Sequence, residues 1–547
     1  MYHLPVSFRS RRLLFGVVFV LIFTIVLFRP APDVTASFYQ RVEGSMLFSA
    51  RHTEHPIPRL VRHYTEKFEA MLSRQSRTLE SAIEEYRRRY HRKPPQGFDK
   101  WFAYARARNS PIIDDFDLIS ESLEPFWSFS GSHLRQNMMS SLQNNSELCI
   151  FGIKSGEFIP QGPGWIAQQL VLSLGINAIK ELPDVTMIFN LLDEPRVLLT
   201  GDHIDRPGFV DFVDASRKHA DWNRTTQPCR AGTISSSRGD VPPTDIETFG
   251  LPFVTDISDA RNICTHPDYA SQHGIFLSPS NLFYTHSAVP IFTQAKPNIF
   301  ADIIFPSYNY AAKYDKSDYR DDQDPLWEEK RNRLSWAGST TGGQGTSDTW
   351  KQSHRQRFIT FTSQLENLTT NFLSEVQPGV WRTVQSDDIY GQLYDAKFTA
   401  IIQCEPEVCN QQQEFFQPGA HQNHSELWHS RFLYDIDGNS FSGRFYSLLL
   451  SRSVVLKQTL FQEWHDERLY PWVHYIPVSM GMEELPEIMR YLALTKAGEP
   501  IAKDIANEGR EWASRSLRKE DFGVYLYRLI LEYARLISET REAGKYD

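Results

Sequence analysis

The sequence predicts an α/β protein built from two halves of about 200 residues each, with a membrane anchor in front of them. Short apolar runs alternate with helical stretches over residues 98–310, and the same alternation returns after residue 330. Residues 13–28 form one run without a charge. Of the 547 residues, 41% are hydrophobic and 23% are charged, which is typical of globular proteins. A net charge of −9 disfavours a nucleic-acid binder.

The uncharged run from Leu13 to Phe28 follows several arginines, and Pro30 lies just beyond it. As a helix it would span ~24 Å at ~1.5 Å per residue, which is short for a ~30 Å hydrocarbon core and suits a thin early-secretory membrane. The positive-inside rule places residues 1–12 in the cytoplasm and the bulk of the chain in the lumen. We therefore expect a single-pass type II protein of the Golgi or ER membrane. A cleaved signal peptide is the alternative, although no A-x-A-like cleavage site follows.

A lumenal location would make other features of the sequence meaningful. Four N-x-S/T sequons lie beyond the anchor, at Asn144, Asn223, Asn367 and Asn423. The five cysteines, Cys149, Cys229, Cys264, Cys404 and Cys409, also lie beyond it. In an oxidising lumen we expect up to two disulfides and one free thiol, with Cys404 close enough to Cys409 for a small loop. No Cys or His cluster has zinc spacing, and the carboxyl terminus is not a KDEL-type signal.

After the anchor, residues 29–97 are expected to form a lumenal stem that contains a helix from Tyr64 to about Arg92. In the first half, residues 98–310, apolar runs at 147–153 and 184–192 predict strands, and residues 164–182 predict the helix between them. This order is typical of a βαβ unit. An acidic, polar stretch at about 311–330 predicts an inter-domain linker.

The second half, residues 311–500, repeats the alternation. Strands are predicted at 333–338, 397–404, 431–438, 452–458 and 473–478, and helices at 441–451 and 483–495. Residues 501–547 are expected to be helical, with a long helix from about Phe522 to Thr540.

Two loops in the second half could bind an anion. The first, Gly338 to Gly345, follows a strand and is rich in glycine and hydroxyl residues, which allow backbone N–H groups to turn toward an anion. It is neither a P-loop nor G-x-G-x-x-G, so a plain surface loop is the alternative. The second, Asp437 to Phe445, joins a strand to a helix that Ser440 or Ser442 could cap. That helix start, with Arg444 in its first turn, would suit a pyrophosphate; an Arg444–carboxylate pair is the alternative.

Carboxylates supply candidates for a metal site and for a base. The D-x-D pattern occurs at Asp115/Asp117, Asp322/Asp324 and Asp435/Asp437, about as often as chance allows, and only the last pair lies at a strand end. Asp193 directly follows a buried apolar run, at the kind of strand end where α/β enzymes place catalytic groups. It could therefore act as a general base, or be only a turn residue before Pro195. No G-x-S-x-G elbow is present, which counts against an α/β-hydrolase.

The same loops resemble those of a known family. RNRLSWAGSTTGGQG, WKQSHRQRF (350–358), DGNSFSGRFYSLLLSRSVVLKQTLFQEW and PWVHYIPV are similar to the capsule-associated-protein (CAP10-like) glycosyltransferases, glycosyltransferase family 90. This family includes the Rumi-type protein O-glucosyltransferases. The similarity runs over about residues 90–536.

The resemblance implies a GT-B-like fold, with two facing Rossmann-like domains, and inverting transfer from UDP-xylose or UDP-glucose to a glycan or glycoprotein hydroxyl. It assigns the base to Asp193, through NLLDEP. It assigns the donor site to Gly338, Ser339, Thr340, Gly342, Asp437, Gly438, Ser442 and Arg444. No metal or other cofactor is implied, although Mn²⁺ stays open.

One position departs from the family pattern. Rumi-type members carry an Arg just before the Gly-Ser pair, and this sequence has Ala337. Either one phosphate contact is absent, or His354, Arg355 or Arg357 replaces it. Two alternatives to the metal-free enzyme therefore stay open: a metal-dependent transferase that uses Asp435/Asp437, and a non-catalytic lumenal sugar-binding protein on the same fold.

Overall fold

The computed structural model describes residues 54–143, 147–201, 203–230, 245–310, 319–365, 368–386, 390–421 and 423–540. The predicted anchor and two sequons, Asn144 and Asn367, lie outside these ranges. Within them, no helix combines the length and apolar character needed to cross a membrane. The chain divides into two units, Met1–Glu54 with Glu375–Arg382, and His55–Ser374 with Thr383–Asp547. The second unit holds both main sheets and is described below.

The first sheet has the strand order β2-β1-β3-β6-β8. Its strands are β1 (Leu148–Lys154), β2 (Glu157–Gln161), β3 (Val185–Asn190), β6 (Ile291–Thr293) and β8 (Ile303–Ile304). β3, β6 and β8 are parallel, whereas β1 is antiparallel to both of its neighbours. The predicted strands are thus present, but the predicted βαβ unit is wrong.

A tight hairpin explains the difference. Ser155 and Gly156 both have positive φ, 53° and 77°, and join Lys154 to its partner Glu157. Two consecutive positive φ values fit a type I′ turn, which returns the chain at once as an antiparallel strand. The strand that results, β2, was not predicted, because it has only 5 residues and its apolar residues are adjacent rather than alternating with polar ones.

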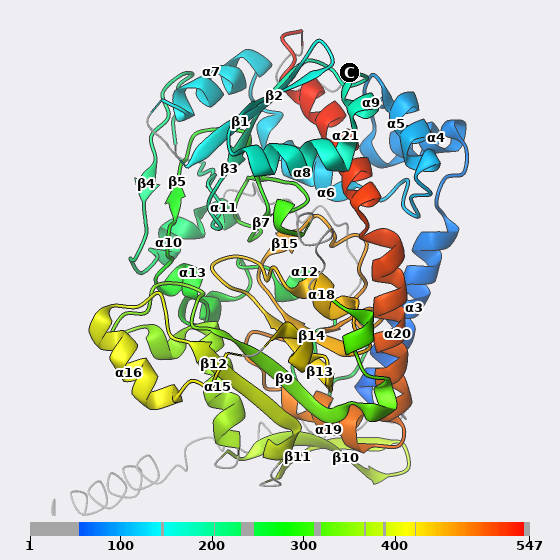
Figure 1. Ribbon diagram of the computed structural model, residues 1–547, viewed down its shortest axis with the longest axis vertical. Helices are drawn as coiled ribbons and strands as arrows, with labels where there is room; N and C mark the ends of the chain where they lie inside the picture. The colour runs from blue at the N-terminus through cyan, green and yellow to red at the C-terminus, as the bar shows by residue number, and fades with distance from the viewer. Residues whose placement is uncertain are drawn as a thin grey trace, which may run out of the picture. The chain divides into compact units, whose positions relative to one another are not determined.

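The second sheet is parallel throughout, with the order β12-β9-β13-β14-β16. Its strands are β9 (Arg331–Ser339), β12 (Tyr394–Ala400), β13 (Ser430–Ile436), β14 (Val454–Gln458) and β16 (Ile476–Pro477). All five overlap the predicted strands, and β12 begins three residues early. Both sheets contain parallel strands and are accompanied by helices, which confirms the α/β class (Figure 1).

Short pairs of strands complete the sheet structure. They are β4 (Val213–Asp214) with β5 (Phe283–Tyr284), β7 (Ala295–Lys296) with β15 (Gln462–Glu463), and β10 (Thr370–Gln377) with β11 (Val380–Ser386). The antiparallel pair of β7 with β15 matters most for the site, because it joins the segment between β6 and β8 to the segment after β14. Segments that adjoin the two main sheets are therefore joined by backbone hydrogen bonds.

Helices accompany both sheets. Those before β9 are α3 (Pro56–Ser73), α4 (Leu79–Tyr90), α5 (Phe98–Ala107), α6 (Asp117–Leu123), α7 (Gly131–Ser141), α8 (Gly164–Leu174), α9 (Ile176–Ile179), α10 (Trp222–Thr225), α11 (Gln227–Arg230), α12 (Ile257–Ala260) and α13 (Gly274–Leu277). Those after it are α15 (His354–Gln364), α16 (Pro406–Phe416), α17 (His424–Leu427), α18 (Phe445–Leu449), α19 (Leu485–Leu494), α20 (Gly498–Ser516) and α21 (Lys519–Leu536).

The segment predicted as a stem is packed where the structure describes it. Its single predicted helix is two helices, because Thr78 caps a new helix at Leu79 through a 3.2 Å hydrogen bond from Ser81 N to Thr78 Oγ1. On α3, the ring of Phe68 contacts that of Trp512 on α20, at 4.9 Å between centroids. On α4, Tyr86 donates a 3.2 Å hydrogen bond to Glu532 on α21.

The last helix returns to the first sheet. α21 packs against α5, α6 and α8 (Figure 1). Trp101 Nε1 on α5 donates a 2.9 Å hydrogen bond to Val524 O on α21, and the Tyr104 and Tyr527 rings lie 5.0 Å apart. Because α20 packs against β14 of the second sheet, the final two helices contact both halves of the chain.

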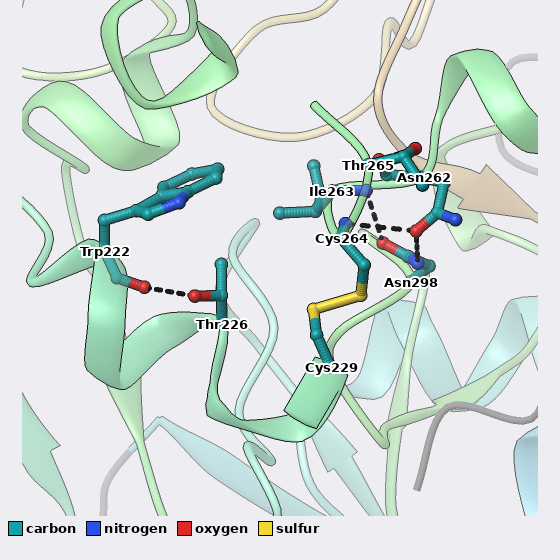
Figure 2. The surroundings of a disulfide bond; sticks show 8 residues. All are labelled: Trp222, Thr226, Cys229, Asn262, Ile263, Cys264, Thr265 and Asn298. Carbon is teal, nitrogen blue, oxygen red and sulfur yellow. Dashed lines mark hydrogen bonds between the residues drawn. A yellow bond between two sulfur atoms is a disulfide. The ribbon is translucent and has the colours of Figure 1, made fainter. Parts of the chain in front are cut away.

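The cysteines form two disulfides, as the sequence indicated. Cys229 of α11 pairs with Cys264, and Cys404 pairs with Cys409, while Cys149 is a buried free thiol. Figure 2 shows the first bridge, whose Cys264 backbone N–H donates a 3.0 Å hydrogen bond to the Asn262 side chain. This bridge ties the loop region before β5 together.

Candidate functional site

The two glycine-containing loops of the second sheet begin at the same edge. β9 ends at Ser339 and β13 ends at Ile436, and because these strands are parallel neighbours their following loops lie together. Gly342 and Gly343 adopt positive φ values of 118° and 111°. A Cβ on Gly342 would lie 2.6 Å from the ring of His354, so this position requires glycine.

Two guanidinium groups lie beneath these loops. The side chains of Arg355 on α15 and Arg444 each lie 5.6 Å from the Trp336 ring. Arg355 donates to Asp437 O at 2.7 Å and to Ser339 O at 3.0 Å, so it holds both loops. Arg444 donates to Ala337 O at 2.6 Å.

The charges of these two arginines are not neutralised by an ion pair with any residue that the structure describes. Burial lowers the pKa of both groups, that of Arg355 to about 9, and the charge of Arg444 lowers the pKa of Arg355 further. Two neighbouring guanidinium groups whose hydrogen bonds go to carbonyl and hydroxyl oxygens favour a bound anion. Arg444 retains most of its N–H donors for that purpose, since a single hydrogen bond to Ala337 uses only one.

The carboxylates at the same strand end are engaged elsewhere. Asp435 Oδ2 accepts a 2.9 Å hydrogen bond from Lys457 Nζ, and Asp437 Oδ2 accepts a 2.9 Å hydrogen bond from Leu460 N. Both carboxylates are 1% exposed. One oxygen of each carboxylate is thus engaged by a protein donor.

The other two D-x-D pairs also have protein partners. Asp115 and Asp117 both contact Arg89, at 3.0 and 3.2 Å. Asp324 forms a buried ion pair with Lys330, and Asp322 lies 3.5 Å from Arg320 at the surface.

Asp193 differs from these carboxylates because its side chain is exposed. It follows β3 of the first sheet, and Asn439 Nδ2 donates a 3.5 Å hydrogen bond to its Oδ2. Its pKa is raised, chiefly because neighbouring protein displaces part of its hydration, while the bond from Asn439 acts in the opposite direction. A solvent-accessible carboxylate with a raised pKa is a stronger base than an ordinary aspartate.

The structure brings most of the predicted site residues together, with exceptions. Gly338, Ser339, Gly342, Gly438 and Arg444 lie on the two loops, and Asn439 links those loops to Asp193. The Thr340 hydroxyl instead bonds the Ile402 backbone at 2.8 Å. Asp437 and Ser442 are buried, and the Ser442 carbonyl accepts a bond from Tyr310.

Two expectations about anion binding by the backbone are wrong. Neither Ser440 nor Ser442 caps the predicted helix, since α18 begins at Phe445 with Arg444 as its N-cap and has only 5 residues. The amides of Gly342 and Gly343 donate to Asn439 Oδ1 at 3.2 and 3.1 Å rather than standing free. The positive character of this edge therefore comes mainly from the arginine side chains.

Of the three cations considered as replacements at Ala337, Arg355 is the one beside Arg444. His354 stacks on His273 at 3.9 Å between ring centroids, and burial holds its pKa well below the usual value, so it is neutral. Arg357 donates to Met480 O at 3.0 Å, away from the loops.

Three residues of the site were missed by sequence reasoning. Trp336 lies inside a predicted strand, and no pattern marks an indole that will stack with two arginines. Ser280 belongs to a turn far from both loops in sequence, and Glu194 stands next to Asp193 but is buried. The apolar run that drew attention to Asp193 was the signal available for Glu194.

Comparison with known proteins supports the resemblance seen in the sequence. Residues 278–544 match the family model described as Glycosyl transferase family 90, a range that contains both loops but not Asp193. The chain is 34% identical over 110 residues to an O-glucosyltransferase rumi homolog of Aedes aegypti, covering 20% of this chain and 27% of that protein. It is 32% identical over 122 residues to Protein O-glucosyltransferase 1 of Homo sapiens, covering 21% of this chain and 30% of that protein.

A longer match extends over 257 residues at 22% identity to Protein O-glucosyltransferase 2 of Danio rerio, covering 45% of this chain and 43% of that protein. The chain thus spans less than half the length of each of these relatives. The matched domain carries the loops and the arginines described above. Residues 278–544 are therefore similar to glycosyl transferase family 90, and the curated relatives with similar segments are protein O-glucosyltransferases.

Proposed function

We propose that this protein is an inverting glycosyltransferase that moves a sugar from a UDP-sugar to a hydroxyl of a glycan or glycoprotein acceptor. One observation carries the proposal: the exposed carboxylate of Asp193, at a strand end of the first sheet, lies 3.5 Å from Asn439 on the loop that bears Arg444. A base and an anion site are thereby joined across two sheets. We assign the fold to the GT-B-like class on the same ground.

The proposed chemistry divides between the two sheets. Asp193 removes the proton from the acceptor hydroxyl, whose oxygen forms a bond to the anomeric carbon from the face opposite UDP. The bond between that carbon and the diphosphate oxygen breaks, and UDP leaves with the electron pair. Arg444 and the neighbouring charge of Arg355 stabilise the negative charge that develops on the diphosphate.

The donor sugar is proposed to be glucose or xylose. The printed names of the relatives describe glucosyl transfer to proteins, which supports UDP-glucose and a glycoprotein acceptor. The family resemblance of the Gly-Ser and DGNSFSGRF loops supports both sugars. Arg355 supplies a cation near Ala337, so the absence of an arginine at that position does not leave the edge uncharged.

A UDP-release assay tests the proposal. The purified full chain is incubated with UDP-glucose or UDP-xylose and a panel of glycan, glycolipid and folded-protein acceptors. We expect acceptor-dependent UDP release with at least one pair. UDP binding without release under every condition would favour the sugar-binding alternative.

The same assay in EDTA addresses the metal. Because fixed arginines serve the diphosphate, we expect activity to persist in EDTA. Loss of activity with rescue by Mn²⁺ would transfer the assignment to Asp435/Asp437 and would require that Lys457 leave Asp435.

We also propose that the protein is a single-pass type II membrane protein with its catalytic part in the lumen of the Golgi or ER. The run from Leu13 to Phe28 supports this, and the sequon residues Asn223 and Asn423 are exposed. Removal of N-glycans should increase the mobility of the expressed protein, and intact microsomes should protect its bulk from protease. A protease-sensitive, unglycosylated product would contradict the topology.

A further inference from the structure

The side chain of Asn439 is the meeting point of the two sheets at this site. Its Oδ1 accepts hydrogen bonds from Gly342 N at 3.2 Å, Gly343 N at 3.1 Å and Ser280 Oγ at 3.1 Å. Its Nδ2 donates to Asp193 Oδ2 at 3.5 Å. One amide side chain thus contacts the proposed base and the glycine-rich loop at once.

These contacts fix the orientation of the amide. The two glycine N–H groups can only donate, so the group that faces them must be the Asn439 oxygen. The Asn439 NH₂ group is then forced to face Asp193. An ionised carboxylate accepts this hydrogen bond more strongly than a protonated one, so the contact favours the form that acts as a base.

The contacts also close a ring around the base. Asp193 is followed by Glu194, whose Oε1 accepts hydrogen bonds from Ser280 N at 3.1 Å and Asn281 N at 3.0 Å. The Ser280 hydroxyl in turn donates to Asn439, which returns to Asp193. A ring of this kind holds each member by two connections, so the position of Asp193 depends on Asn439.

We propose that Asn439 is a positioning residue that sets the orientation and the proton affinity of Asp193 and couples both to the glycine-rich loop. The inference rests on the proposed function, because it takes Asp193 as the base. The titratable neighbours that act on Asp193 are Glu194, from its own segment, and Tyr308, from the segment after β8. Neither is a cation, so within the part of the chain that the structure describes Asn439 is the group that favours the ionised carboxylate.

The test is the pH dependence of kcat/KM for Asn439→Ala and Asn439→Asp beside the wild type. Loss of the donor should raise the pKa of Asp193, because a hydrogen bond to the ionised form is removed. The acid limb should therefore move to higher pH, by about half a unit or more for Asn439→Ala. Asn439→Asp keeps an acceptor for the glycine amides but adds a like charge, so its shift should be larger.

Asn332→Ala is the control. Asn332 is an exposed asparagine at the start of β9, where its side chain donates a 2.7 Å hydrogen bond to Ala493 O, away from both loops. Its acid limb should stay near that of the wild type.

The outcomes separate this inference from the proposed function. If the Asn439 variants fold and lose activity by the same factor at every pH, Asn439 is only structural and the inference is wrong. If the wild type releases UDP with none of the donor and acceptor pairs tested, the proposed function fails and the inference fails with it.

Discussion

The loops that follow β3 and β13 differ in which of their charged groups are exposed or unpaired. After β3, the carboxylate of Asp193 is exposed and has a 3.5 Å contact with an amide. After β13, Asp437 is buried and held by a backbone N–H, and the strand's own Asp435 is paired with Lys457. There the cations Arg444 and Arg355 are the groups without a carboxylate partner in the described residues.

This difference shows which charges are available for chemistry. A buried, paired carboxylate contributes to the fold and is costly to disturb, whereas an exposed carboxylate with a raised pKa can exchange protons. Likewise, an arginine that bonds only carbonyl oxygens can still attract an anion. In the proposed mechanism the site therefore combines proton removal on the first sheet with anion binding on the second.

The largest effect should come from breaking the buried pair of the second sheet. Asp435→Asn leaves the charge of Lys457 without its closest partner, and the free energy of unfolding should fall by about 3–5 kcal/mol. Denaturant unfolding measures this change. Asp395→Asn is the control, because Asp395 pairs with Arg333 on the same sheet at a partly exposed position and should cost about 1 kcal/mol or less.

An unchanged stability of Asp435→Asn would mean that Asp435 is not tied to Lys457 in solution. It would reopen the alternative in which Asp435/Asp437 binds a metal.

A second variant, Glu194→Gln, tests the contrast between the exposed Asp193 and its buried neighbour in the loop after β3. Burial raises the pKa of Glu194 from 4.5 to about 7, so the folded state retains a proton that the unfolded chain has already lost. The associated stability is present below about pH 4.5 and declines as the pH rises to about 7, by up to about 3 kcal/mol. Glu194→Gln cannot ionise, so its stability relative to the wild type should increase over this range.

Chemical unfolding at pH 4.5, 5.5, 6.5 and 7.5 measures the difference. Glu157→Gln, at an exposed position on β2, is the control for replacing a glutamate by glutamine. A constant difference between Glu194→Gln and the wild type would show that Glu194 is ionised normally.

The anion site of the second sheet is probed by Arg444→Ala. Loss of a charge-assisted contact should weaken UDP binding by about 1.5–3 kcal/mol, or 10- to 150-fold, as measured by calorimetry. Arg331→Ala serves as control, because Arg331 is exposed at the opposite end of β9. Wild-type affinity in Arg444→Ala would place the donor elsewhere.

Much of the second sheet could be predicted from the sequence, because buried parallel strands leave apolar runs such as the residues Val454 to Leu456 of β14. The first sheet was harder to predict from the sequence. The hairpin between β1 and β2 depends on two positive φ values at Ser155 and Gly156, and β2 itself is mostly exposed, so no apolar pattern revealed it.

The same limit applies to the site. A strand end followed by Asp or by a Gly-rich loop is visible in the sequence, and it pointed to Asp193, Gly338 and Arg444. The partner of each charge is not visible, because Lys457, Leu460 and Ile402 reach Asp435, Asp437 and Thr340 only in the folded chain. Asn439 lies within the Asp437 to Phe445 loop that the sequence marked, but its contacts with both sheets depend on tertiary structure.

The assignment of proton removal to the first sheet and donor binding to the second is tested most directly by Asp193→Asn. This change keeps the shape of the side chain and removes its basicity, so UDP-sugar turnover should fall by ~10²–10⁴-fold. The calorimetric affinity for UDP should stay close to that of the wild type, because Asp193 would face the acceptor. Asp211→Asn, at another exposed carboxylate of the first half, controls for the loss of charge. Normal turnover in Asp193→Asn, or a loss of UDP affinity equal to the loss of turnover, would contradict the account.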